Sequence, residues 1–164
     1  MKWSDGEDFN AEDVVFTLNM LKEQAPILVR SAAVDAAVAS AEAVDDYTVH
    51  IKFNGPRPRF MFTYMMSKFD TGIYWVPEHV FNGIEDVASF KYYDLEKGWP
   101  LATGPYKIVS WSPTQKIVDR RDEWWGVETG FMDKMPEIER IIVVPFAGDT
   151  IMSQQIAGNS VDST

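Results

Sequence analysis

The stretch that decides the fold is residues 103–126, which read TGPYKIVSWSPTQKIVDRRDEWWG. An alternating apolar and polar run begins at Tyr106, turn-forming residues occupy 112–115, and a second extended run begins at Lys116. This pattern predicts a β-hairpin. The pair Trp124-Trp125 then places two large aromatic side chains where the second strand ends. The stretch holds no catalytic group, and we interpret it as a scaffold.

A helix is predicted near the N-terminus. Asn10 is a good N-cap, and Asp13 stands where its side chain can reach back to the cap. Pro26 limits the helix to about Gln24. One face of this helix should be an apolar stripe formed by Ala11, Val14, Leu18 and Leu21.

The rest of the chain alternates short extended and helical patterns. The alanine-rich passage 31–37 is expected to be mobile, and the aromatic run 59–68 predicts a short helix that is buried or covered by a partner. The β-branched run 138–146 predicts a strand that is buried on both faces. Further patterns predict strands at 38–44 and 47–53, a short helix from Pro77 to Phe81, loop over 82–101, and a helix at 147–157.

Several of these segments carry a resemblance to a known family. The hairpin region, a block at 2–18 and shorter matches downstream are similar to the family 5 extracellular solute-binding proteins, the peptide, oligopeptide and nickel receptors of ABC importers. Asp119, Asp122 and Trp124 depart from the family's usual residues, which leaves the subgroup and its ligand open. The matching positions are 2–18, 76–80, 103–106, 111–115, 117–118, 121–122, 124–125, 135–141 and 158–162.

The resemblance implies a mixed α/β (α+β) fold. It would be a twisted sheet with β-hairpins and packed helices, part of lobe one of a periplasmic-binding-protein-like fold of type II, cluster C. Residues 1–100 would form the small subdomain of lobe one and residues 101–164 part of its main sheet, with the second lobe absent. At 164 residues the chain looks like an internal fragment, because family members are several times longer. No charged segment and apolar run of a signal peptide precede the block at 2–18, and we draw no expectation about the compartment from that.

The function that the resemblance implies is binding without catalysis and without a cofactor. The full-length parent would capture a peptide or similar small solute in the periplasm, or attached to the membrane outside a Gram-positive cell. It would then deliver the solute to the permease subunits of an ABC importer. Because two lobes close over the ligand in this family, one lobe alone should bind weakly or not at all.

Three alternatives stay open. The abundant tryptophan keeps an oligosaccharide or opine-like ligand in view within the same family. An enzyme, such as a glycosidase-like hydrolase using Asp5 or Glu7, would need two carboxylates facing each other at about 5 to 10 Å. An interaction module would self-associate through apolar surface, and an exposed patch larger than a few hundred Å² would favour it.

Composition excludes several kinds of site. The chain has no cysteine, so it has no disulfide and no thiolate ligand or nucleophile. Its 25 acidic and 15 basic residues give a formal net charge of −10, which disfavours nucleic acid and anionic membrane surfaces as partners. No apolar run approaches the roughly 20 residues that span a bilayer.

Most polar residues have a structural interpretation. The acidic residues at 5–13 suit a capped helix with a solvated approach better than a calcium loop, and His50 and His79 stand too far apart in the sequence for a metal site. Trp111 and Trp125 are expected in the core because they end strands.

Some residues remain as candidates for ligand binding. Arg120 and Arg121 can either clamp a ligand carboxylate or pair with nearby acids. We expect the turn before the hairpin to present backbone groups to a cleft. The predicted ligand-side residues are Trp75, Thr103, Gly104 and Tyr106.

Overall fold

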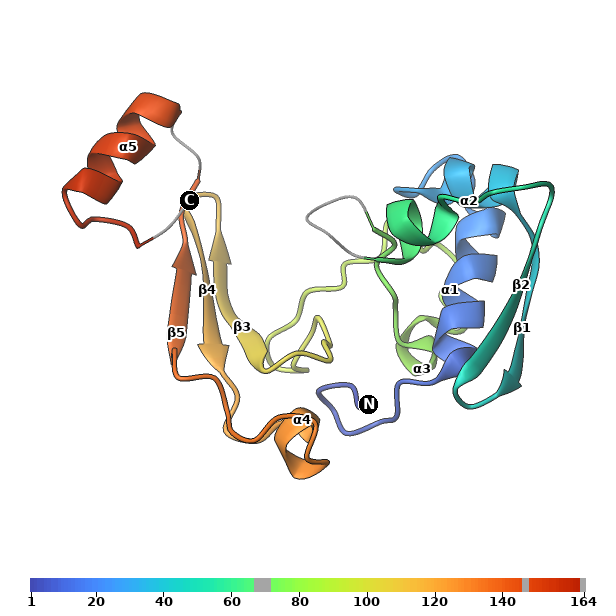
Figure 1. The fold of residues 1–164 in the computed structure, drawn as a ribbon, viewed down its shortest axis with the longest axis horizontal. Coiled ribbons are helices and arrows are strands. Elements are labelled where there is room, and N and C mark those ends of the chain that lie inside the picture. Colours follow the sequence, from blue (N-terminus) through green and yellow to red (C-terminus); the bar gives the residue numbers. More distant parts are fainter. Residues whose placement is uncertain (67–71, 146–147, 163–164) are drawn as a thin grey trace. The chain divides into compact units, whose positions relative to one another are not determined.

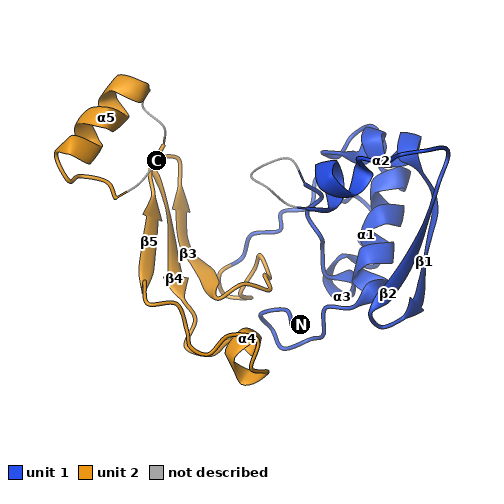
Figure 2. Cartoon of the chain, viewed as in Figure 1, with its two compact units in different colours: residues 1–94 blue, residues 95–164 orange. Residues whose placement is uncertain are grey.

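The computed structural model describes residues 1–66, 72–145 and 148–162. The chain divides into two compact units, Met1–Asp94 and Leu95–Thr164 (Figure 2). The division therefore falls six residues before the predicted boundary at residue 100. Neither unit contains, in its described residues, a helix long and apolar enough to cross a membrane.

Unit 1 packs helices against a two-stranded antiparallel hairpin (Figure 1). Helix α1 lies along both the hairpin and the second helix, so it forms the centre of the unit. The elements in chain order are α1 (Ala11–Glu23), α2 (Ser31–Ala37), β1 (Val38–Asp45), β2 (Thr48–Phe53), the π-helix η1 (Met61–Met65) and α3 (Glu78–Phe81).

The predicted start and stripe of α1 are confirmed. The Asn10 side chain accepts a hydrogen bond from the Glu12 backbone N–H at 2.9 Å, and Asp13 Oδ2 accepts one from the Asn10 N–H at 3.2 Å. These bonds satisfy N–H groups that the first helical turn leaves free. Leu18 and Leu21 are buried on the inner face, so the helix supplies the core as its apolar spacing predicts.

The alanine-rich passage proves to be a helix, α2, and the expectation of a mobile segment is wrong. Its Val34 is fully buried and its Ala37 nearly so. Burial of these side chains against α1 stabilises a segment of 7 residues, which is too short to be a stable helix by itself although alanine favours a helix. The core cluster of unit 1 consists of Leu18, Leu21, Val34, Ala37, Val38, Phe60 and Ile73.

The aromatic run is largely exposed rather than buried. Phe60 is buried, whereas the side chains of Met61, Phe62 and Met66 are more than half exposed. The apolar outer face of this helical turn is therefore exposed to solvent. Of the two expectations for the run, burial is wrong, and cover by a partner stays a prediction. Residues 67–68 of the predicted helix lie outside the described residues.

Unit 2 is built on the predicted hairpin. Its antiparallel sheet has the order β3-β4-β5, with Tyr106 opposite Arg120 and Ile117 opposite Ile142 (Figure 1). The elements are β3 (Tyr106–Ser112), β4 (Gln115–Arg120), α4 (Trp125–Glu128), β5 (Arg140–Val143) and α5 (Asp149–Ala157).

Two expectations about burial in unit 2 are wrong. Strand β5 is exposed along its whole length, with Ile142 55% exposed, because among the described residues it lies at the edge of the sheet and packs against β4. Residue 146 of the predicted strand lies outside the described residues. Trp111 is also exposed, and the Lys116 ammonium lies 4.3 Å from the centre of its ring. A β-branched or aromatic residue favours a strand, but its neighbours in space decide whether it is covered.

Candidate functional site

The turn before β3 holds the end of β4. The backbone N–H of Arg121 donates to the Pro105 carbonyl at 2.8 Å, and its side-chain Nε donates to the Gly104 carbonyl at 3.2 Å. The turn therefore fixes both the backbone and the guanidinium stem of Arg121. Two segments that the sequence singled out, the turn and the arginine pair, meet at this point.

The other polar groups of the turn are also used within unit 2. The Thr103 carbonyl accepts hydrogen bonds from Trp124 Nε1 at 2.8 Å and from Trp125 Nε1 at 2.6 Å. The Tyr106 hydroxyl donates to the Ile138 carbonyl at 2.9 Å. These bonds explain why two adjacent tryptophans follow β4, since both indole N–H groups tie the chain back to the same carbonyl.

Trp75, the remaining predicted ligand-side residue, belongs to unit 1. It is half-buried and packs against the core cluster of that unit. The contact of Trp75 and of the turn residues with a ligand stays a prediction.

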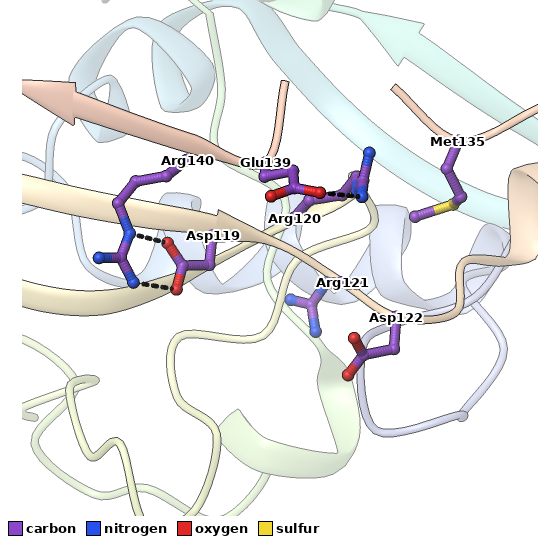
Figure 3. Close-up of a pocket in the computed structure, with 7 residues that line it drawn as sticks. All are labelled: Asp119, Arg120, Arg121, Asp122, Met135, Glu139 and Arg140. Atoms are coloured by element: carbon purple, nitrogen blue, oxygen red, sulfur yellow. Dashed lines mark hydrogen bonds and ion pairs between the residues drawn. The ribbon is translucent and has the colours of Figure 1, made fainter. Parts of the chain in front are cut away.

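A pocket of about 740 Å³ lies beside the end of β4 (Figure 3). We call it the arginine pocket, because three arginines contribute to its wall. Its other charged residues are three acids, and one methionine adds an apolar group. The lining residues are Arg120, Arg121, Arg140, Asp119, Asp122, Glu139 and Met135.

Two of the arginines are paired with acids across the sheet. Arg140 binds Asp119 through two hydrogen bonds of 2.6 and 2.7 Å (Figure 3). These bonds hold the pKa of the Asp119 carboxyl below its ordinary value, and they raise that of Arg140. Arg120 pairs with Glu139 at 3.2 Å and also donates to the Pro136 and Glu137 carbonyls.

Arg121 and Asp122 stand apart from these pairs. The Arg121 side chain is half-buried, and burial lowers its pKa because the charged form loses water. In the part of the chain that the structure describes, the Gly104 carbonyl is the partner of its Nε, and neither Nη group has one. The exposed Asp122 carboxylate has no hydrogen bond or ion pair among those residues either.

The acidic residues near the N-terminus serve the fold of unit 1. Asp13 is buried and accepts hydrogen bonds from three segments, and Asp5 pairs with His79 at 2.8 Å. His50 lies on the polar face of β2 beside Glu42, at 3.7 Å. Within the described residues, no three acidic or histidine side chains gather as a metal site would require.

The sequence indicated part of this site. It singled out the turn and the pair Arg120-Arg121, but it did not point to Glu139 or Arg140 as lining residues. The missing signal is the strand register, because Arg140 lies opposite Asp119 only when β5 pairs with β4. A cross-strand charge pair would have been readable once that register was known.

Comparison with known protein families and with curated proteins finds solute-binding proteins in both cases. The model of the bacterial extracellular solute-binding proteins, family 5, matches residues 1–164. The Agrobacterium fabrum protein named "probable peptide-binding protein YejA" is 28% identical over 98% of this chain. The chain spans about a quarter of the length of that relative (25%).

Solved structures give the same picture. The periplasmic oligopeptide-binding protein of an oligopeptide ABC transporter from Thermotoga maritima matches 99% of this chain with a TM-score of 0.70 and 25% identity. The matched part is 28% of that protein. A structure of the same protein with bound mannohexaose matches 99% of this chain and 28% of its own, with a TM-score of 0.68 and 25% identity.

Proposed function

Because the chain belongs to the bacterial extracellular solute-binding proteins, family 5, we propose that its parent is the substrate-binding component of an ABC importer. The parent captures a peptide or similar small solute in the periplasm or outside the cell and delivers it to membrane permease subunits. It acts without catalysis. The observation that carries this proposal is the family match over all 164 residues.

The position of the chain within the parent is part of the proposal. Residues 1–100 belong to the small subdomain of lobe one and residues 101–164 to part of its main sheet. The structural match to 28% of a longer oligopeptide-binding protein supports the proposal that the chain is one part of a larger parent. Trp75, Thr103, Gly104 and Tyr106 are the proposed ligand-side residues, with part of the Trp75 indole still exposed at the surface of unit 1.

The ligand class has two candidates. Peptides are favoured by the names of YejA and of the Thermotoga protein. An oligosaccharide is the second candidate, because a structure of the Thermotoga protein contains mannohexaose. Flat aromatic side chains such as Trp75 bind both kinds of ligand.

We expect the parent to bind ligand far more tightly than the 164-residue chain does. Two lobes share the contacts in the proposed mechanism, so the chain alone loses most of them. Calorimetric titration with short peptides of mixed sequence, and separately with manno-oligosaccharides, measures both proteins. The parent should show a Kd of about 1 μM or lower, equivalent to roughly −8 kcal/mol.

Two results would count against this proposal. A micromolar Kd for the 164-residue chain alone would contradict the need for two lobes. A parent that binds neither peptide nor oligosaccharide would contradict the ligand class.

Self-association of the isolated chain is a further proposal. The exposed apolar residues of β5 and η1 support it, since bare β-branched edge strands are templates for pairing. Sedimentation velocity over a concentration series should show a fraction of dimer that increases with the protein concentration. Ile142→Lys, in the middle of β5, should return the chain to a monomer. A wild-type chain that stays monomeric at every concentration would contradict the proposal.

A further inference from the structure

The charges of the arginine pocket divide into matched and unmatched groups. Its wall carries three guanidinium groups and three carboxylates. Arg140 is matched with Asp119 and Arg120 with Glu139. Arg121 and Asp122 remain, and Figure 3 draws no dashed line from either to another lining residue.

Arg121 is arranged to accept an anion. Its Nε bond to Gly104 directs one edge of the guanidinium group inward to the turn, which leaves both Nη groups without a partner in the described chain. A guanidinium group can bind a carboxylate through two parallel N–H bonds. Since Arg121 is half-buried and no carboxylate of the described residues pairs with it, a bound carboxylate would stabilise the charged form.

Asp122 adds the opposite charge next to this group. It follows Arg121 directly in the chain and lines the same pocket. It can therefore accept hydrogen bonds from an ammonium group that lies beside the bound carboxylate. A ligand that carries two negative charges would meet repulsion from Asp122 and from the net charge of −10.

We propose that Arg121 and Asp122 form a subsite for a small zwitterion, with the ligand carboxylate on Arg121 and its protonated amine on Asp122. The chemistry fits a free amino acid or a short unblocked peptide. This inference rests on the proposed function, because it names the chemical class that a peptide-like solute would present. The subsite lies wholly within unit 2, so weak binding should be detectable in this chain alone.

The test is an NMR titration of the ¹⁵N-labelled 164-residue chain. The Nε–H of Arg121 is a direct probe, because its hydrogen bond to Gly104 slows its exchange with water. Glycine and glycylglycine are the zwitterionic probes, N-acetylglycine carries only the carboxylate, and glycinamide carries only the amine. Glycine and glycylglycine also distinguish an amino acid from a dipeptide as the better ligand.

We expect saturable shifts at millimolar concentrations of the zwitterions. N-acetylglycine and glycinamide should each bind at least about 3-fold more weakly than the zwitterions, which is the loss of affinity expected when one exposed ion pair is removed. The variants are compared through the backbone amide signals of the turn at 103–106 and of Asp122, which both variants retain. In these signals, Arg121→Gln should abolish the response to all carboxylates, while Asp122→Asn should remove only the preference of the zwitterion over N-acetylglycine. Arg59→Gln, which changes an exposed arginine of unit 1, is the matched control and should leave the titration unchanged.

Other outcomes would overturn the inference. A shift that does not saturate, or that sodium chloride reproduces at equal ionic strength, would mean screening rather than a site. An equal response of Arg121→Gln and Arg59→Gln would place the binding elsewhere. If the chain alone gives no dispersed spectrum, the same probes and variants in the full-length parent decide the question.

The inference and the proposed function fail separately. A parent that binds peptides at micromolar concentration, with no effect of Arg121→Gln, would sink the subsite alone. A zwitterion site in this chain, together with a parent that binds no solute, would sink the importer function alone.

Discussion

Replacing Asp13 with alanine is expected to destabilise unit 1 by more than about 3 kcal/mol, because it removes a buried carboxylate that accepts three hydrogen bonds. Each hydrogen bond to a charged group contributes roughly 1.5–3 kcal/mol. Alanine would also leave three donors unsatisfied in the interior. We expect no exposed acidic residue of the chain to have an effect of this size.

The three donors come from the helix cap itself, from the chain before it and from a segment 65 residues further along the sequence. Trp3 Nε1 donates to Asp13 Oδ2 at 3.1 Å, and the Glu78 backbone N–H donates to Oδ1 at 2.8 Å. The third donor is the backbone N–H of the N-cap residue, Asn10, at 3.2 Å from Oδ2. One turn later, Thr17 Oγ1 accepts a hydrogen bond from the Val76 N–H at 3.1 Å. The same helix face is therefore tied both to the first residue of α3 and to the chain just before it.

Urea unfolding followed by tryptophan fluorescence measures this effect, since Trp3 contacts Asp13 directly. Asp13→Asn keeps one acceptor oxygen and should fall between wild type and alanine. Glu12→Ala is the matched control, because Glu12 is an exposed acid in the same helical turn and should cost no more than about 1 kcal/mol. Equal losses for Asp13→Ala and Glu12→Ala would show that the buried bonds do not stabilise the unit.

Replacing Gly126 with alanine is expected to destabilise unit 2 by about 1–3 kcal/mol, the usual cost of overpacking. A Cβ atom on Gly126 would lie 2.5 Å from the ring of Trp124, which must then move. That ring also donates to the Thr103 carbonyl, so its displacement loosens the turn that holds Arg121. The steric cost outweighs the gain of about 1 kcal/mol that alanine has over glycine inside a helix.

Near-UV circular dichroism and urea unfolding together measure this change. The tryptophan signal should alter along with the free energy of unfolding, because the substitution displaces an indole ring. Gly55→Ala is the control, since a Cβ there meets no atom within 4 Å and the residue has no positive φ. A Gly126→Ala variant that matches this control in both measurements would contradict the predicted clash.

Local features were predictable from the sequence. The start of α1 follows from Asn10 and Asp13, which lie three residues apart, and the hairpin follows from a period-two pattern around a four-residue turn. Family membership also came from ordered motifs along the chain, and the comparison over residues 1–164 confirms it. Each of these signals lies within a few residues, so it can be read without knowing which segments meet.

What the tertiary structure decided involves residues that are distant in sequence. Helix α2 forms because Val34 is buried against α1. Strand β5 is exposed because it lies at the edge of the described sheet. In the candidate site, the sequence named Arg120 and Arg121 together, either as a clamp for a ligand carboxylate or as partners of nearby acids. The pairing of β5 with β4 brings Arg120 and Arg140 to their acidic partners. The turn at 103–106 binds the Nε of Arg121, and Arg121 and Asp122 are left without an ion-pair partner among the described residues. Strand register and packing set these distances, and neither is encoded in the spacing of neighbouring residues.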